Sequence, residues 1–175
     1  MTTDDEAMVS LADAARDQYF LSSPEKLALL VQAADIRASD AVVEVGAGIG
    51  SVARVLPASA SLTLIELDDR FTDILRSRFP HATVIQGDAL TLLHHVPCDV
   101  LLSNLPREPT EKVIGVLPRL AVRTAVIATG ENPDLTPLDG YFESEVVTSI
   151  GGDDFRPPQP VLSLLIRISR ISGSS

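Results

Sequence analysis

Short runs of β-branched and other apolar residues alternate with segments of helical period through most of the chain. The runs predict buried strands at 41–45, 62–66, 83–85, 99–103 and 124–128. Capping residues and apolar stripes predict helices between them, the first beginning at Ser22 or Ser23 and the others over 52–56, 68–79 and 110–117. Strands that alternate with helices predict an α/β fold with a Rossmann-like, doubly wound, mostly parallel sheet.

The last part of the chain departs from this alternation. Residues 130–140 contain Pro and Gly without a helical period, which predicts a loose loop. Residues 142–150 and 161–171 predict two strands with no helix between them, which favours a late antiparallel strand pair at the sheet edge. We find no repeat and no second domain, so we expect one domain over 1–175, with residues 1–16 partly flexible.

Three glycines on alternate positions directly follow the first predicted strand. Gly46, Gly48 and Gly50 predict a tight turn whose backbone comes close to a ligand. Ser51 stands where the dinucleotide fingerprint has glycine. Glu44, just before the loop, is unusual for a buried strand and suits a cationic or amine-bearing ligand.

Two further acids lie at the ends of later strands. Glu66 lies twenty residues after Gly46, where an acid can bind both ribose hydroxyls of a nucleoside. Asp88 is placed where it could accept a hydrogen bond from the exocyclic amine of a purine, although an Asp that caps a helix explains the same spacing. For the whole set, the alternative is a glycine-rich turn with solvated acids.

Composition limits the compartment and the partners. The chain has 175 residues and 45% hydrophobic residues, enough for one domain with a core. We find no membrane-spanning run and no signal-peptide pattern, so we expect a cytoplasmic protein without membrane contact. The net charge of −10 disfavours attraction to nucleic-acid phosphates.

The histidines and the cysteine give no sign of a metal site. His81, His94 and His95 have no partners at the spacing of metal ligands or of a catalytic triad, so we interpret them as surface or packing residues and expect no metal. Cys98 is the single cysteine, which excludes an internal disulfide, and we expect it to face the core.

Six short motifs, in order, resemble those of the ribosomal RNA adenine dimethyltransferase family. The resemblance covers about 17–168. It is carried by Gln18-Tyr19-Phe20-Leu21, the loop from Glu44 to Gly50, Ile65-Glu66-Leu67-Asp68, Gly87-Asp88-Ala89, Asn104-Leu105-Pro106, and a late segment with Phe155, Pro157, Pro158, Val161 and Ser163. Single motifs of this kind are weak evidence, but six in the right order are strong.

The resemblance implies the class I methyltransferase fold, S-adenosylmethionine as cofactor and methyl transfer to an amine. It implies catalytic roles for Asn104, Leu105 and Pro106, since the Asn side-chain and Pro backbone oxygens can hold the amine's hydrogens. It implies acceptor contacts by Arg107 and Phe155. The cofactor-binding residues that it implies are Gln18, Phe20, Leu21, Glu44, Gly46, Gly48, Gly50, Glu66, Leu67, Asp88, Ala89 and Asn104.

The chain also departs from the family pattern. Position 107 is Arg where the family has an aromatic residue that stacks on the flipped adenine. The loop 130–140 replaces a longer segment near the substrate, and the helical domain that contacts RNA in the small-subunit enzymes does not follow the last strand. We therefore expect a truncated, divergent member with a small-molecule acceptor, with RNA as a second choice.

Two alternatives to a methyltransferase stay open at this stage. The chain could bind S-adenosylmethionine without transferring a methyl group, which Arg107 favours because a cation beside a sulfonium and an amine is unhelpful. It could instead be a nicotinamide oxidoreductase, although Ser51 and Glu44 argue against that. An adenine N-methyltransferase acting on ribosomal RNA is the alternative within the family.

Overall fold

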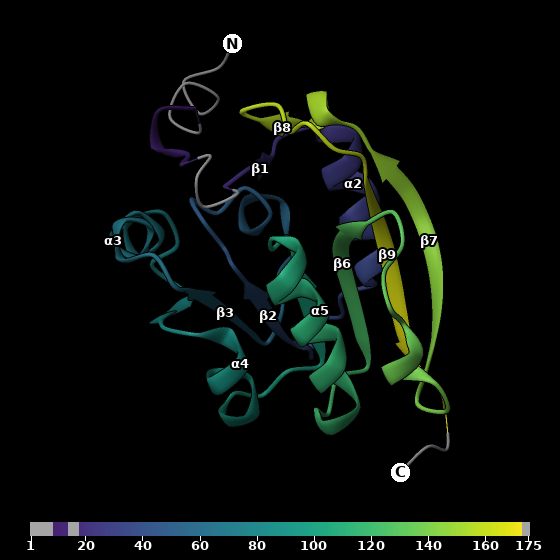
Figure 1. Ribbon diagram of the computed structural model, residues 1–175. Helices are drawn as coiled ribbons and strands as arrows, with labels where there is room; N and C mark the ends of the chain where they lie inside the picture. The colour runs from purple at the N-terminus through teal and green to yellow at the C-terminus, as the bar shows by residue number, and fades with distance from the viewer. Residues whose placement is uncertain (1–8, 14–17, 173–175) are drawn as a thin grey trace.

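The computed structural model describes residues 9–13 and 18–172. Most of the predicted flexible segment 1–16 lies outside the described residues. Seven strands form one sheet in the order β4-β3-β2-β5-β6-β9-β7 (Figure 1). Their bounds are β2 Ala41–Val45, β3 Ser61–Glu66, β4 Thr83–Gln86, β5 Val100–Ser103, β6 Thr124–Gly130, β7 Phe142–Ile150 and β9 Ser163–Arg170.

The sheet confirms the predicted topology. The pairs that link β4, β3, β2, β5 and β6 are all parallel, whereas β9 is antiparallel to both β6 and β7. The order of the parallel strands reverses between β2 and β5. A crevice outside the carboxyl ends of the strands at such a reversal is the usual ligand site of an open α/β sheet.

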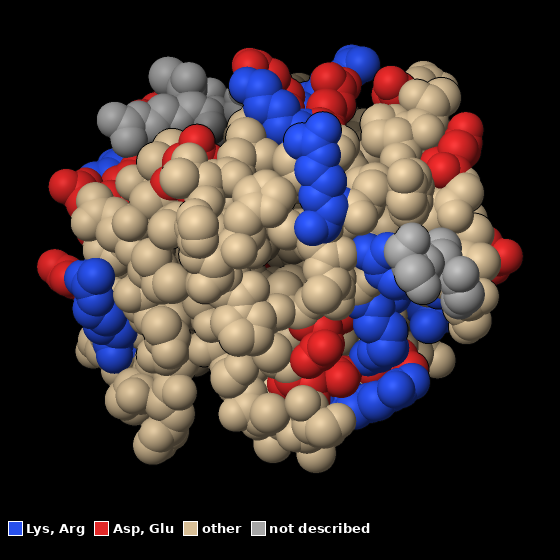
Figure 2. Space-filling model, turned by 90° about the horizontal axis from the view of Figure 1, so that it is seen from below, with Lys and Arg blue, Asp and Glu red and all other residues tan. Residues whose placement is uncertain are grey.

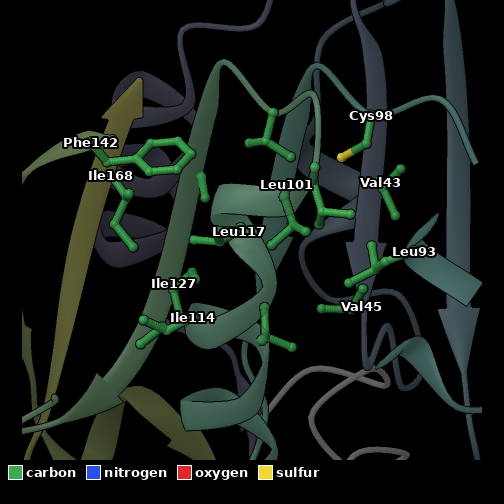
Figure 3. Packing of buried hydrophobic residues seen from close by; sticks show 14 of the residues in the cluster. Val43, Val45, Leu93, Cys98, Leu101, Ile114, Leu117, Ile127, Phe142 and Ile168 are labelled. Atoms are coloured by element: carbon green, nitrogen blue, oxygen red, sulfur yellow. The ribbon is translucent and has the colours of Figure 1, made fainter. Parts of the chain in front are cut away.

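Helices cover both faces of this sheet, with α5 in front and α2 behind in Figure 1. The helices are α2 Pro24–Ala34, α3 Asp69–Arg78, α4 Ala89–Leu92 and α5 Arg107–Val116. Val113 and Ile114 of α5 pack on Val43 and Ile127 in the larger core cluster, which also holds Cys98 (Figure 3). On the other face, α2 buries an apolar stripe against the sheet, formed by Leu27, Leu30 and Ala34.

Local sequence explains where two of these helices begin. Ser23 caps α2, because its side chain accepts a hydrogen bond from the Lys26 backbone, and Pro24 takes the first helical position. Asp68 caps α3 in the same way by accepting from the Arg70 backbone. Of the two starts that the sequence left open for α2, the structure selects the Ser23 cap.

Two predicted helices differ in the structure. Residues 52–56 form only the 3₁₀ turn η2 Ala53–Val55, which Pro57 follows and cannot continue as a helix. Helix α5 begins at Arg107 rather than at 110, since Pro109 falls in the first turn, where its missing N–H costs nothing.

A short ribbon that the sequence did not predict joins two segments that lie far apart in the chain. Strand β1 Phe20–Leu21 pairs antiparallel with β8 Phe155–Arg156. The backbone N–H groups of Ser22 and Ser23 both donate to the carbonyl of Asp154, at 2.8 and 3.1 Å. These bonds fix the segment that begins at Gln18 to the rest of the molecule.

Four further 3₁₀ turns lie among the described residues. They are η3 Leu93–His95, η4 Leu117–Arg119, η5 Thr136–Leu138 and η6 Gly152–Asp154. The turn η5 lies in the predicted loose loop and buries Leu138 against the core that α5 covers. The described part of the chain contains no helix long and apolar enough to cross a membrane.

Candidate cofactor and acceptor site

A cavity of about 620 Å³ opens outside the carboxyl ends of β2, β3, β4 and β5. It draws together residues from five of the six motifs, which lie far apart in the sequence. The predicted site residues that line it are Gln18, Phe20, Gly46, Gly48, Glu66, Leu67, Asp88, Ala89, Asn104, Leu105 and Pro106. Their convergence at the strand reversal makes this cavity the candidate functional site.

The glycine loop forms the wall at the end of β2. Gly46 and Gly48 have φ of 68° and 54°, which side chains rarely adopt. A Cβ on Gly48 would lie 2.7 Å from Cε1 of Phe20, whose ring also lines the cavity. Gly50 is not among the lining residues. A Cβ there would collide with the ring of Phe79, which follows α3. The absence of a side chain at Gly50 therefore lets the end of α3 pack against the loop.

Glu66 joins this loop to the end of β3. Its side chain is 8% exposed, and its Oε2 accepts a hydrogen bond of 2.7 Å from the backbone of Gly48. Its Oε1 accepts one of 2.9 Å from the backbone of Asp68. Burial raises the pKa of Glu66, and these hydrogen bonds oppose the rise. Each carboxylate oxygen has a second lone pair, so Glu66 can still accept from a ligand.

Glu44, which the sequence predicts to bind the cofactor, is not among the residues that line the cavity. It is 4% exposed, and its Oε2 has no hydrogen-bond partner among the described residues. Burial, and then the charge of Glu66, raise the pKa of Glu44 to about 8, against a hydrogen bond from the Ala53 backbone. The carboxyl is therefore mostly neutral at pH 7.

A polar network holds the entry segment beside the cavity. Gln18 donates through Nε2 to Oδ2 of Asp68 at 3.2 Å and accepts from Nη2 of Arg70 at 3.3 Å. The hydrogen bond from Arg70 is the main reason that the pKa of Asp68 is lowered. Asp68 and Tyr19 also line the cavity; both lie inside the motifs, but neither was predicted as a site residue.

Asp88 combines the two roles that the sequence left open. Its Oδ1 accepts a hydrogen bond of 2.9 Å from the Leu90 backbone, so it caps α4. It also lines the cavity and is exposed. The cap leaves the other carboxylate oxygen available, and cofactor binding by Asp88 stays a prediction.

A second cavity of about 440 Å³ adjoins the first. The two cavities share Tyr19, Asn104, Leu105 and Pro106. Nδ2 of Asn104 donates to the carbonyl of Tyr19 at 3.2 Å. Since a carbonyl only accepts, this bond orients the amide and leaves Oδ1 of Asn104 as an acceptor at the junction.

The two predicted acceptor contacts lie in different surroundings. Arg107 lines the second cavity, but its side chain is 77% exposed and its Nε donates to Oε1 of Glu111 at 2.9 Å. Phe155 is 1% exposed and packs in the core cluster with Leu21. Neither Phe155 nor Leu21 lines either cavity, so the structure does not bring these two predicted residues to the site.

The three histidines and the cysteine line neither cavity. His81, His94 and His95 are exposed, as expected for surface residues. Cys98 is buried, and burial and then the charge of Asp99 raise the pKa of its thiol to about 12. Within the described residues, no three His, Cys, Asp or Glu side chains gather where they could hold a metal ion.

The chain is similar in sequence and in structure to known methyltransferases. The chain is 29% identical to a dimethyladenosine transferase of Chaetomium thermophilum, over 90% of this chain and 47% of the relative. It is 28% identical to a ribosomal RNA small subunit methyltransferase A of Dehalococcoides mccartyi, over 86% and 60%. A dimethyladenosine transferase structure from Plasmodium falciparum superposes with a TM-score of 0.79 at 22% identity, covering 89% of this chain and 64% of that one.

The chain thus spans about half the length of the curated relatives that it matches. The structural similarity confirms the class I methyltransferase fold. The sequence model of the ribosomal RNA adenine dimethylase family matches residues 13–113, which is more than half of the chain. The chain belongs to the ribosomal RNA adenine dimethylase family.

Proposed function

We propose that this protein is an S-adenosylmethionine-dependent methyltransferase that methylates an amine. The larger cavity would hold the cofactor and the smaller one the acceptor. The observation that carries the proposal is that the two cavities meet at Asn104, Leu105 and Pro106. A methyl donor and an amine acceptor bound in adjoining cavities would face each other there.

The larger cavity suits the cofactor in size and chemistry. Its volume of about 620 Å³ lies within the range of about 300–1,000 Å³ that small-molecule sites occupy. Glu66 and Asp88 offer carboxylate oxygens for ribose hydroxyls and for an adenine amine, and exposed Leu67 offers an apolar surface beside them. The glycines at 46 and 48 let the backbone come close to the ligand.

Asn104 is the residue best placed to orient the acceptor amine. Bound S-adenosylmethionine would supply an electrophilic methyl group, which leaves its sulfur as the acceptor nitrogen forms the new bond. Oδ1 of Asn104 can accept a hydrogen bond from the acceptor amine and so turn the nitrogen lone pair towards the methyl. The amine proton then passes to water.

The surroundings of Arg107 weaken the case for a binding protein without methyl transfer. Its guanidinium is mostly exposed and paired with Glu111, so solvent and a carboxylate screen its charge. It lines the second cavity and not the first. A cation in that position does not confront the sulfonium directly.

The chemical class of the acceptor can be inferred from two sets of observations, which point to different molecules. The names of the relatives refer to dimethyladenosine and to ribosomal RNA, which favours an RNA adenine. The net charge of −10 and the loss of the aromatic residue at 107 favour a small-molecule amine. We propose an adenine-type amine, with RNA as the first candidate and a free small molecule as the second.

Two measurements test the proposal. Calorimetric titration with S-adenosylmethionine, S-adenosylhomocysteine and NAD should show binding of the first two only, and binding of NAD alone would establish the oxidoreductase instead. Labelled methyl transfer should then be measured on unmodified ribosomal RNA and, in parallel, on a small-molecule extract. Label in one pool identifies the acceptor class, and label in neither, despite cofactor binding, would refute methyl transfer.

A further inference from the structure

The second cavity has a single aromatic side chain among the described residues that line it. That residue is Tyr19. The two positions expected to supply aromatic faces do not do so, since position 107 is Arg and Phe155 is buried in the core. An acceptor in this cavity can therefore stack on one described aromatic ring only.

The backbone of Tyr19 is held from both sides. Its carbonyl accepts the hydrogen bond from Nδ2 of Asn104 at 3.2 Å, and the next two residues form β1, which pairs with β8. Its half-buried side chain packs against the core cluster that contains Phe155, and Tyr19 is a lining residue of both cavities. A ring fixed in this way has little freedom to lose when a ligand stacks on it.

The Tyr19 hydroxyl has no hydrogen-bond partner among the described residues. The ring is thus placed by packing and by its backbone, and no polar contact of the hydroxyl requires a tyrosine rather than another aromatic residue. This separates two roles that mutation can test, because phenylalanine keeps the ring and leucine keeps only apolar bulk.

We propose that Tyr19 is the stacking platform on which the acceptor base lies beside Asn104. This inference rests on the proposed function and adds a specificity residue to it. A flat ring selects planar heteroaromatic amines, such as adenine, over aliphatic amines, because every base offers a π-face and an alkyl amine does not. The same ring would hold the exocyclic amine in the plane that Oδ1 of Asn104 reaches.

Tyrosine fluorescence gives a readout that does not depend on turnover. The chain has two tyrosines and no tryptophan, so Tyr141→Phe leaves Tyr19 as the single tyrosine emitter. Tyr141 is 45% exposed and lines neither cavity, which makes the variant a suitable background. We would saturate it with S-adenosylhomocysteine and titrate a single-stranded adenine oligoribonucleotide, adenosine and putrescine.

Stacking predicts quenching by the oligoribonucleotide or by adenosine and none by putrescine. Tyr19→Leu should weaken binding of the quenching ligand about tenfold or more by calorimetry, while Tyr19→Phe should keep it within about threefold. Urea unfolding of both variants would serve as the folding check, because Tyr19 also lines the cavity proposed for the cofactor. Equal acceptor affinity in Tyr19→Leu and wild type would overturn the inference.

The same experiment separates failure of this inference from failure of the proposed function. If wild type binds no S-adenosylhomocysteine, the proposed function fails and Tyr19 fails with it. If the cofactor binds and methyl is transferred, but no adenine probe quenches the Tyr19 emission, only the Tyr19 inference is overturned.

Discussion

Glu44 carries an unusual charge state for a residue so close to a ligand loop. Its pKa is raised from an ordinary 4.5 to about 8, first by burial and then by the charge of Glu66. Between these two pH values the folded protein keeps a proton that the unfolded chain releases. The free energy of unfolding contributed by Glu44 is therefore highest below pH 4.5, falls as the pH rises, and levels off above pH 8.

We predict that Glu44→Gln flattens the fall in stability between pH 5 and pH 8.5, because the amide stays neutral throughout. Some slope should remain, since burial also raises the pKa of Glu66. Urea unfolding at several pH values measures the effect, with the exposed Glu143→Gln as the control. A slope in Glu44→Gln equal to that of wild type would contradict the assignment.

Site residues could be predicted well where their position along the backbone decides their role. They were predicted less well where the role depends on the direction of the side chain. Glu66 ends β3 and Asp88 lies two residues after β4, at the edge of the sheet where the cavity opens, so spacing was enough to place them. Glu44 and Phe155 lie in quoted motifs too, yet both are buried away from the cavities. Motif letters give a position along the backbone, whereas the face on which a side chain lies depends on tertiary packing.

At the scale of elements, the glycine loop shows how one backbone segment shapes the cavity. We predict that Gly48→Ala lowers cofactor affinity at least tenfold, because its Cβ would push the Phe20 ring from 2.7 Å and because φ there is 54°. Calorimetric titration with S-adenosylhomocysteine measures this.

Gly115 offers a matched control for the same substitution. It lies in α5, and a Cβ there would meet nothing within 4 Å. Gly115→Ala should therefore leave cofactor affinity unchanged and raise the free energy of unfolding by about 0.5–1 kcal/mol. Equal affinity in the two variants would remove the steric role of Gly48.

Strand β8 supplies the next prediction at this scale. Phe155→Ala should destabilise the fold by about 3–5 kcal/mol, the usual cost of removing a buried Phe. Phe155→Leu should cost much less stability than Phe155→Ala, because leucine refills most of the space. Its Michaelis constant for the acceptor should stay close to that of wild type. A Michaelis constant raised more than tenfold in Phe155→Leu, at little cost in stability, would return Phe155 to the acceptor site.

The elements themselves could be predicted where local pattern decides. The long apolar runs of β2, β5 and β6 and the capped stripe of α2 were visible in the sequence. The ribbon of β1 and β8 was not, because each strand has two residues and they pair across most of the chain. No hydrophobic period exists over two residues, so a pairing of this kind depends on tertiary contacts.

At the scale of the whole molecule, the described residues that line the two cavities include few cations: Lys112 lines the first cavity and Arg107 the second. Arg123 pairs with Asp40, which precedes β2, at the end of the sheet opposite the cavities. Figure 2 shows the molecule from below, at the end of the sheet away from the cavities, and on this face Lys and Arg lie beside Asp and Glu. Arg107 is the only cation among the described residues that line the second cavity.

For an RNA acceptor, we therefore predict weak salt dependence of binding. A plot of log affinity against log salt should have a slope shallower than about −2, because each phosphate contact contributes about −0.9. Arg107→Gln should reduce this slope by about one. Filter binding to ribosomal RNA over a range of salt measures it, and a slope steeper than about −4 would reveal a basic surface that the described charges do not form.

The central claim is that methyl transfer takes place where the two cavities meet at Asn104. The most direct test compares Asn104→Ala with Gln32→Ala, since Gln32 is exposed on α2 and lines neither cavity. We predict that Asn104→Ala lowers the rate of labelled methyl transfer at saturating cofactor about 100-fold, with cofactor affinity changed less than about threefold, and that Gln32→Ala stays near wild type. Undiminished transfer in Asn104→Ala, or an equal loss of transfer and cofactor affinity, would contradict the account.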